Sequence, residues 1–269
     1  MPPVAPLSSA KAKLIRDLLR TKRTRDRERA FVIEGEKPVQ ELLAARSPML
    51  RAVVVAESRL RKPGPLRLLL GRGPAPAYVC RDSMFEKLSE VSSPAGLLAV
   101  VEQPAWNQAV ILQRPQVLGL YGECLQDPAN VGAIVRTALG FGLDALWLTP
   151  DSADVFNPKV VRATAGALLA LPVFTIADVR HLTGQGCAIL AAEPPGPSSR
   201  AIQDVAAIPA RSILAFGNES RGLSETTTKR AALRFHIPVS PAVQSLNVAA
   251  AAAVAAFYFS RLLRDGRKS

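Results

Sequence analysis

The chain has 269 residues, 48% of them apolar, so it can form one large domain or two modest ones and bury a core without disulfides. Its 34 lysines and arginines outnumber 22 acidic residues, and the net charge of +12 favours a polyanionic partner, usually nucleic acid, with an anionic membrane surface as the weaker alternative. Three scattered cysteines and two isolated histidines form no ligand-spaced cluster, so we expect no metal site and a reducing compartment. The longest apolar run, 248–259, is too short for a bilayer and no signal core opens the chain, so a cytoplasmic protein without a membrane partner is expected.

Basic residues are concentrated near the start of the chain. Nine lysines and arginines and three acidic residues lie between Lys11 and Arg29, so this segment supplies half of the net charge. Four apolar residues at helical spacing predict an amphipathic helix in its first half, namely Leu14, Ile15, Leu18 and Leu19. We interpret the segment as a phosphate-contacting surface whose removal (residues 1–29) weakens polyanion binding and little else; a merely solvated helix is the alternative.

Short apolar runs alternate with helix-like segments over the next hundred residues. A strand beginning at Phe31, a glycine turn and a helix come first, and further strands are predicted at 52–56, 77–80 and 97–102, with a helix at 83–89. This alternation predicts a small α/β domain over residues 1–103. A proline-containing stretch with Trp106, residues 104–115, is the expected linker.

Buried parallel strands are indicated in the remainder, residues 116–269. Apolar runs separated by helix-length segments occur at 117–121, 145–149, 172–176, 188–192 and 213–216. The last predicted helix, 245–264, is apolar around most of its circumference, so it must be buried inside the fold or against another subunit. The sequence therefore predicts an α/β protein with a parallel-sheet C-terminal domain.

The stretch from Leu125 to Gly142 combines a helix start with two conspicuous polar residues. Asp127 is placed to cap a helix and Pro128 to occupy its first position. Asn130 then lies in the first turn and Arg136 nearly two turns later, in an otherwise apolar segment. The apolar positions expected to bury one face are Val131, Ile134, Val135, Ala138 and Leu139. A capped helix with one solvated arginine is the alternative interpretation.

Two later stretches add further motifs to the helix start at 125–142. Residues 213–224 are a buried-strand pattern that runs into a glycine-flanked polar turn, and residues 237–248 are a proline-stiffened loop that enters the last helix. In this order and at these separations, the three stretches resemble the three motifs of the SpoU/TrmH branch of the SPOUT RNA methyltransferases. The basic segment leading into Phe31-Val-Ile-Glu-Gly also resembles the L30e-like substrate-binding domain of many SpoU-type enzymes, with Glu34-Gly35 as its best marker; a plain turn at Gly35 is equally compatible.

The resemblance implies a deep trefoil knot, a homodimer formed through the C-terminal domain, and S-adenosylmethionine as cofactor. It implies cofactor contacts, largely through the backbone, at Gly217, Asn218, Ile237 and Leu246. The catalytic residues that it implies are Asn130, Arg136, Glu219, Ser245 and Asn247. The structural alternatives are turn chemistry at Gly217, a helix-end bond for Asn130, a salt bridge for Glu219 and helix capping by Ser245. If adenine approaches the backbone of Gly217, Gly217→Val should weaken cofactor binding with little loss of fold.

The motifs contain no Ser/His/Asp arrangement, partnered cysteine nucleophile or phosphate loop, so hydrolysis and phosphoryl transfer are poorly supported. Methyl transfer from an activated sulfonium needs mainly alignment, which alone contributes roughly 7–11 kcal/mol. The family's arginine is often assigned as the base. Since a guanidinium stays protonated near neutral pH, we favour a role in which Arg136 grips a phosphate and stabilises a developing 2′-oxyanion, although the sequence leaves both roles open.

We therefore expect an RNA-binding enzyme that methylates a ribose 2′-hydroxyl, with large-subunit ribosomal RNA as the preferred substrate. Transfer RNA is the alternative substrate. A catalytically silent RNA-binding or ribosome-assembly protein of the same fold is the alternative from another class. Pro241 and Val239 depart from the residues commoner in the family, glycine and methionine, so the backbone of the cofactor loop is expected to differ there.

Overall fold

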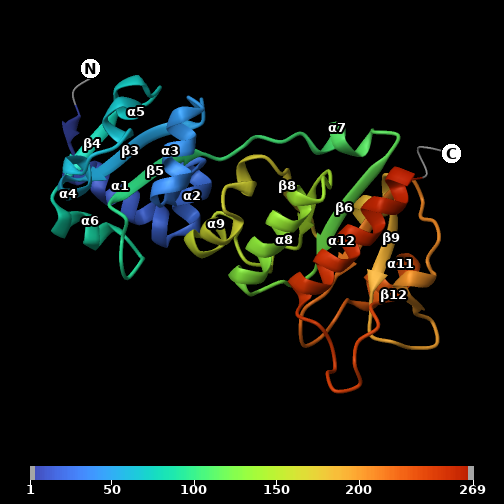
Figure 1. The fold of residues 1–269 in the computed structure, drawn as a ribbon. Helices are drawn as coiled ribbons and strands as arrows, with labels where there is room; N and C mark the ends of the chain where they lie inside the picture. The colour runs from blue at the N-terminus through green and yellow to red at the C-terminus, as the bar shows by residue number, and fades with distance from the viewer. Residues whose placement is uncertain (1–3, 266–269) are drawn as a thin grey trace. The chain divides into compact units, whose positions relative to one another are not determined.

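The computed structural model describes residues 4–265. The chain divides into two compact units, Met1–Ala105 with Phe156–Arg162 and Trp106–Val155 with Ala163–Ser269, and each unit contains its own β-sheet (Figure 1). The division at Ala105 falls inside the segment expected to be a linker, 104–115. The second half of that segment contains α7 (Gln108–Leu112), whose Ile111 and Leu112 are buried in the C-terminal core. Within 4–265, no helix is long and apolar enough to cross a membrane.

The N-terminal sheet has five strands in the order β1-β4-β3-β5-β2. Strand β5 is antiparallel to both β2 and β3, and the other pairs are parallel. Because side chains alternate along a strand, Ala30 and Val32 join the core beneath the first helix while Phe31 and Ile33 face the other side. The strands predicted at 77–80 and 97–102 have those bounds, and the two-residue β1 is an addition. The strands are β1 (Ala5–Pro6), β2 (Ala30–Glu34), β3 (Leu50–Ala56), β4 (Ala77–Cys80) and β5 (Leu97–Glu102).

Six helices that lie before Ala105 accompany this sheet within the described residues, and the same unit contains residues 156–162, which include most of a later helix. The predicted amphipathic helix forms, and Ile15, Leu18 and Leu19 are buried in the core, whereas Leu14 lies at its exposed margin. Gly35 precedes the third helix with φ of +132°, a conformation that favours glycine, so the turn interpretation accounts for it. The helices are α1 (Ser9–Arg20), α2 (Lys22–Glu28), α3 (Glu36–Ala44), α4 (Glu57–Arg61), α5 (Leu66–Arg72) and α6 (Asp82–Leu88).

Arg25 differs from the other cations of the basic segment because it is buried. Its Nη1 donates hydrogen bonds to the carbonyl oxygens of Leu18 at 2.7 Å and Leu19 at 3.2 Å. It thereby satisfies carbonyl groups at the end of α1, which have no partner within the helix. The expectation that all nine cations contact phosphates is wrong for Arg25. Removing residues 1–29 would also remove α1 from the core, so that deletion is not a clean test of charge.

The C-terminal sheet has seven parallel strands in the order β10-β12-β9-β11-β6-β7-β8. The five predicted strands are confirmed. Strand β12 was not predicted, because Arg234 and His236 interrupt its apolar pattern, and neither was the short β10. The bounds are β6 (Val117–Gly122), β7 (Leu146–Leu148), β8 (Val173–Thr175), β9 (Ala188–Ala192), β10 (Arg200–Ala201), β11 (Arg211–Phe216) and β12 (Ala231–His236).

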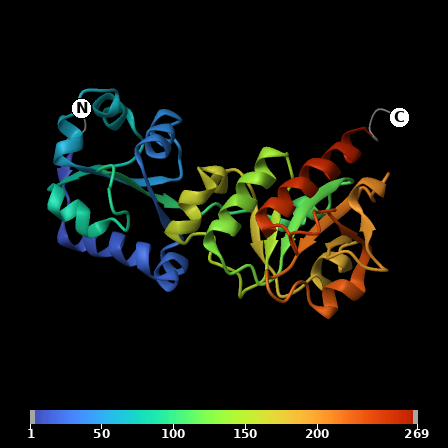
Figure 2. The ribbon, with the colours of Figure 1, turned by 60° about the horizontal axis from the view of Figure 1, so that its bottom comes forward.

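Helices cover both faces of this sheet. Residues Ile111 and Leu112 of α7 and Leu182 of α10 pack with Val117 and Tyr121 of β6 on one face. Helices α8 and α12 lie side by side on the other, as both views show (Figures 1 and 2). The remaining helices are α8 (Pro128–Gly140), α9 (Pro158–Thr164), η1 (Ala167–Leu169), α10 (Arg180–Gly184), η2 (Ile202–Asp204), α11 (Glu225–Arg230) and α12 (Val248–Asp265).

The outer surface of this helix pair remains apolar and exposed in the single chain. Val254 and Phe257 of α12 are 41% and 48% exposed, and Leu139 of α8, which was expected to be buried, is 38% exposed. The rings of Phe141 and Phe257 lie 5.9 Å apart between centroids and connect the two helices. The expectation that α12 is buried on nearly all sides is therefore not met within one chain.

Candidate active site

Four neighbouring strands of the C-terminal sheet end at one edge, and the predicted site residues follow them. Strands β12, β9, β11 and β6 are adjacent and parallel, so their carboxyl ends point the same way. In open parallel sheets, ligands bind beyond these ends. The three motifs follow β6, β11 and β12, and sheet topology therefore brings them together.

The first motif begins as predicted. Asp127 caps α8, its Oδ1 accepting a hydrogen bond from the Ala129 amide at 2.9 Å, and Pro128 occupies the first turn. Asn130 is almost buried, with 8% of its surface exposed. A primary amide needs both donor and acceptor partners when buried, so its neighbours determine its orientation.

Asn130 joins the three motifs through its side-chain amide. Its Nδ2 donates to Oε1 of Glu219 at 2.6 Å, and its Oδ1 accepts from Nδ2 of Asn247 at 2.9 Å. These residues are 89 and 117 positions away along the chain. The contact satisfies both ends of the Asn130 amide and holds the Glu219 carboxylate at the edge of the sheet. Three residues expected at the site are thus joined by hydrogen bonds, with Asn130 between Glu219 and Asn247.

Asn247 also begins the last helix. Its Oδ1 accepts hydrogen bonds from the amides of Ala249 at 2.9 Å and Ala250 at 3.3 Å, which makes Asn247 the N-cap of α12. The alternative that Ser245 caps this helix is wrong. Ser245 and Leu246 are exposed in the loop before it, and Ile237, directly after β12, is half-buried.

The second motif forms a tight turn. The main chains of Asn218 and Gly222 exchange hydrogen bonds at 3.1 and 2.8 Å, and Gly222 has φ of +69°. A Cβ on Gly217 would lie 2.1 Å from the carbonyl carbon of Gly222, so glycine is required by the turn itself. The turn, and not room for adenine, is therefore the physical reason for glycine at position 217. A branched side chain there disrupts the turn, so Gly217→Val cannot separate cofactor binding from local folding.

Asn218 uses its side chain to organise the same turn. Its Oδ1 accepts from the amides of Ser220 at 3.0 Å and Arg221 at 3.2 Å, while its Nδ2 donates to the Cys124 carbonyl at 2.9 Å. The side chain is therefore occupied by protein partners, and the backbone remains as the means by which Asn218 can contact a ligand.

Arg136 stands apart from the Asn130 contact. It lies on α8, six residues after Asn130, and its side chain is exposed. Within residues 4–265 it makes no hydrogen bond or ion pair. An exposed guanidinium with free donors near a polar site is suited to a phosphate or a developing negative charge.

Two ionisable groups beside the site remain neutral at neutral pH. The Asp151 carboxylate accepts a hydrogen bond from the Cys124 thiol and raises the pKa of that thiol above its ordinary value. Burial raises the pKa of Tyr121, and the negative charge of Glu123 adds to this effect. A neutral thiol is a poor nucleophile, so the structure gives no support to covalent catalysis by Cys124.

The loop that follows β9 was not singled out from the sequence, yet it begins at the same edge. The Glu193 amide donates to the Phe235 carbonyl at 2.9 Å, and Ser199 Oγ lies 3.0 Å from Nδ1 of His236. Residues 193–199 therefore border the loop that contains Ile237. The predicted strand at 188–192 was the available signal, because any loop at a carboxyl end of a parallel sheet is a site candidate. In the part of the chain that the structure describes, no cluster of His, Cys, Asp or Glu could hold a metal ion.

Fold and candidate site together define a two-domain α/β protein with a cluster of polar residues at the carboxyl edge of a parallel sheet. Residues 118–257 match the SpoU rRNA Methylase family model, and residues 10–99 match the MRM3-like substrate binding domain model. The chain is 30% identical to the 23S rRNA (guanosine(2553)-2′-O)-methyltransferase RlmP of Bacillus subtilis, over 94% of this chain and 98% of the relative. The chain belongs to the SpoU rRNA methylase family.

Solved structures agree with this assignment. A TrmH-family protein from Porphyromonas gingivalis is 32% identical, with a TM-score of 0.76 over 96% of this chain and 99% of that chain. The SpoU methyltransferase AviRb from Streptomyces viridochromogenes, solved in complex with AdoMet, has a TM-score of 0.83 over 97% of this chain and 100% of that chain. At 24% identity, the second comparison shows the common fold.

Proposed function

We propose that this protein transfers a methyl group from S-adenosylmethionine to a ribose 2′-hydroxyl in large-subunit ribosomal RNA. The observation that carries the proposal is the hydrogen-bonded contact of Glu219, Asn130 and Asn247, which joins all three motifs at the edge of the parallel sheet. The names of two relatives support the substrate class: the Bacillus subtilis enzyme and a 27% identical Streptomyces viridochromogenes enzyme are both 23S rRNA 2′-O-methyltransferases.

The residues at the edge fit an adenosine-containing cofactor. Half-buried Ile237 and exposed Leu246 and Val243 offer apolar surface on the loop between β12 and Asn247. Apolar side chains gathered on a loop beside a sheet edge are suited to cover a planar base. Gly217, Asn218, Ile237 and Leu246 remain our proposed cofactor contacts. When bound, S-adenosylmethionine supplies the methyl group in an already activated form.

Side chains of the three motifs supply the other functions, which are binding the RNA and stabilising the reacting ribose. Arg136, which is exposed and has no hydrogen-bond or ion-pair partner among residues 4–265, would hold an RNA phosphate beside the reacting ribose and stabilise negative charge that develops on its 2′-oxygen. Asn130 and Asn247 hold Glu219 in place, and we propose that Ser245 contacts RNA from the exposed loop. The 2′-proton passes to solvent or to a phosphate oxygen, since no side chain at the site is an evident base.

The proposed RNA surface of the N-terminal domain is the exposed face of α1 and α2. Arg25 is buried and Arg16 is half-buried, and the other cations of the segment are exposed: Lys11, Lys13, Arg20, Lys22, Arg23, Arg27 and Arg29. Six exposed cations on two consecutive helices, with Arg29 directly after them, provide strong attraction for phosphates, and this attraction falls with salt. The match of residues 10–99 to a substrate-binding domain model supports this assignment.

We also propose a knotted C-terminal domain and a homodimer that covers the apolar surface of Leu139, Val254 and Phe257. The exposure of these side chains supports the dimer, since their burial would be favourable by roughly 25 cal/mol per Å². Light scattering should give twice the mass of one chain, and Phe257→Asp should give the mass of one. A monomeric wild-type protein would contradict the dimer.

The decisive experiment is methylation in vitro. The purified protein, labelled S-adenosylmethionine and 23S rRNA that lacks the modification should give label in RNA that resists alkaline cleavage at one ribose. Label in transfer RNA alone would favour the alternative substrate. A protein without S-adenosylmethionine binding by calorimetry would favour the silent RNA-binding alternative.

A further inference from the structure

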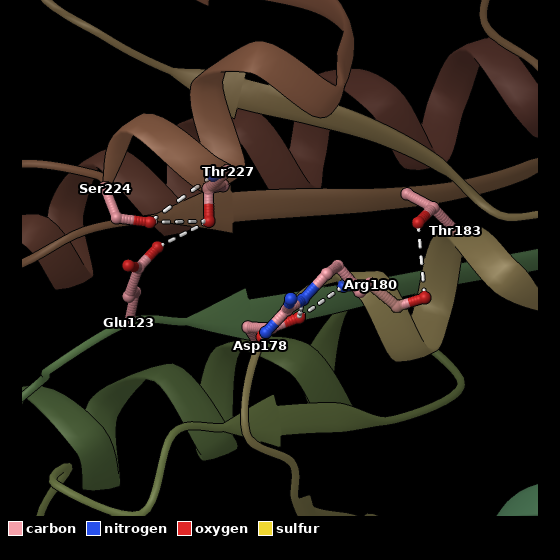
Figure 3. Close-up of polar contacts among 6 residues, drawn as sticks. All are labelled: Glu123, Asp178, Arg180, Thr183, Ser224 and Thr227. Atoms are coloured by element: carbon pink, nitrogen blue, oxygen red, sulfur yellow. Dashed lines mark hydrogen bonds and ion pairs between the residues drawn. The ribbon is translucent and has the colours of Figure 1, made fainter.

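The tight turn Asn218–Gly222 is attached at its two ends to two adjacent residues, Cys124 at its entry and Glu123 beyond its exit. At its entry, Nδ2 of Asn218 donates to the Cys124 carbonyl at 2.9 Å. Beyond its exit, Oγ1 of Thr227 donates to Oε2 of Glu123 at 2.6 Å (Figure 3). Glu123 and Cys124 directly follow β6, and the Glu123 amide donates to the Phe216 carbonyl at 2.9 Å. The turn is therefore held from both sides by the segment Glu123–Cys124, through the carbonyl group of Cys124 and the side chain of Glu123.

Thr227, which makes the contact beyond the exit of the turn, is buried. It has no exposed surface, and its hydroxyl accepts from Ser224 Oγ at 3.3 Å while donating to Glu123. Ser224 Oγ also accepts the Thr227 amide at 3.3 Å and caps α11. The Ser224 hydroxyl, the Thr227 hydroxyl and the Glu123 carboxylate thus form a directed chain. A hydroxyl donor in a buried position is costly to leave without an acceptor, so the Glu123 contact is strongly favoured.

Helix α11 needs this external contact. It has six residues, Glu225–Arg230, and a helix this short is not stable by itself. Asp178, shown in the same view, is already paired with Arg180, whose Nε donates to both carboxylate oxygens at 2.8 and 3.0 Å (Figure 3). The carboxylate available to Thr227 is that of Glu123. The contact of Thr227 with Glu123 therefore holds the start of α11 next to the end of β6. It also holds the end of the turn that precedes α11.

We propose that Glu123 and Thr227 are positioning residues of the cofactor site. They fix the turn Asn218–Gly222, which contains Glu219, the hydrogen-bond partner of Asn130, and Asn218, whose backbone is a proposed cofactor contact. The identity of the ligand rests on the proposed function. The attachment of the turn to Glu123 through Thr227, which we call the clamp, is independent of that function. Loss of the Thr227 hydroxyl should loosen the turn and weaken S-adenosylmethionine binding without unfolding the domain.

The test compares three variants of the full chain. Thr227→Val removes the hydroxyl and keeps the shape, Thr227→Ser keeps the hydroxyl, and Thr226→Val makes the same change at an exposed position of the same helix. Amide exchange of residues 216–224, followed by mass spectrometry, should become at least fivefold faster in Thr227→Val alone. Calorimetric affinity for S-adenosylmethionine should fall at least fivefold in that variant and stay within twofold in the other two. Melting temperature is recorded for each.

Each outcome decides the proposal. Unchanged amide exchange in Thr227→Val overturns it. An equal loss of S-adenosylmethionine affinity in Thr226→Val or in Thr227→Ser also overturns it. If Thr227→Val does not fold, Glu123→Met replaces it, because that change keeps the length of the side chain and removes both acceptor oxygens. Faster exchange of the turn is again the expected result, and unchanged exchange overturns the proposal. A wild-type protein that does not bind S-adenosylmethionine refutes the proposed function, while the exchange comparison still decides the clamp.

Discussion

Each of the two sheets lies between helices, but polar side chains are distributed around them in different ways. In the N-terminal domain, exposed cations gather on α1 and α2, and the buried Arg59 pairs with the exposed carboxylate of Glu36. In the C-terminal domain, Glu219, Asn130 and Asn247 come from distant parts of the chain and meet at one edge.

The difference follows from strand direction. Seven parallel strands place all their carboxyl ends at one edge, so loops far apart in sequence converge there. In the N-terminal sheet, β5 runs opposite to the other four strands, and the charge of that domain acts over the surface of α1 and α2 instead. We therefore expect changes in the two regions to be separable, one altering RNA affinity and its salt dependence, the other altering cofactor binding and turnover.

The largest expected effect is that of Arg136→Ala. Turnover should fall at least 100-fold, a barrier increase of about 2.7 kcal/mol, because the charge that grips phosphate and oxyanion is lost. Affinity for S-adenosylmethionine, measured by calorimetry, should stay within a few-fold. Turnover within tenfold of the wild type would contradict the role. Arg264→Ala is the matched control, since Arg264 is an exposed arginine on α12 whose Nη2 donates only to the Phe141 carbonyl.

The second prediction concerns the basic surface of α1 and α2. Replacing four of its exposed cations by glutamine should flatten the plot of log affinity against log salt by about three units, at roughly 0.7–0.9 per phosphate contact, and weaken RNA binding more than tenfold at low salt. The four positions are Lys13, Arg20, Lys22 and Arg23.

The control for that experiment lies in the same domain. Four exposed cations of the α4–α5 region, replaced in the same way, should leave the slope almost unchanged, and these are Arg61, Lys62, Arg67 and Arg72. Equal slopes in the two variants would mean that net charge, and not this surface, attracts RNA. Cofactor binding should be the same in both.

Gly217→Ala should weaken S-adenosylmethionine binding by about tenfold or more. The added Cβ would collide with the backbone of Gly222 and Leu223, so the turn must shift. Gly140→Ala is the matched control, because a Cβ there meets nothing within 4 Å. Calorimetry on both variants measures the difference, and equal affinities would show that the turn tolerates displacement.

Arg25→Gln tests the one buried cation of the basic segment. Loss of its bonds to the carbonyls of Leu18 and Leu19 should lower stability by roughly 1.5–3 kcal/mol, the range for hydrogen bonds to charged groups. Thermal unfolding should shift by several degrees. Arg23→Gln, an exposed neighbour, should shift it little. A larger shift in Arg23→Gln than in Arg25→Gln would contradict the structural role of Arg25 and make it a candidate phosphate contact again.

The smallest effect concerns Cys124. Because Asp151 raises the pKa of its thiol, the thiolate forms at higher pH than in an ordinary cysteine, and alkylation by iodoacetamide should have a correspondingly high pH midpoint. Asp151→Asn removes the negative charge, so the midpoint should move to lower pH. Cys80 and Cys187 are buried and should react only after unfolding. An unchanged midpoint would exclude Asp151 as the cause.

Local patterns in the sequence were sufficient for most elements. Asp127 and Pro128 identified the start of α8, and continuous apolar runs identified five of the seven C-terminal strands. Strand β12 was not predictable in this way, because Arg234 and His236 occupy alternate positions in it. Its pairing with β9, a tertiary contact, is what makes it a strand.

The sequence by itself singled out the polar residues Asn130, Glu219 and Asn247, because they stand in ordered motifs within apolar surroundings. Only the tertiary structure decided what those residues do to one another: Asn130 bridges Glu219 and Asn247, Asn247 rather than Ser245 caps α12, and Gly217 is required by its own turn. It also separated Arg25 from its charged neighbours by burying it. The physical reason is that residue type fixes which bonds a side chain can form, whereas burial and distance, which depend on the whole fold, fix the bonds that it does form.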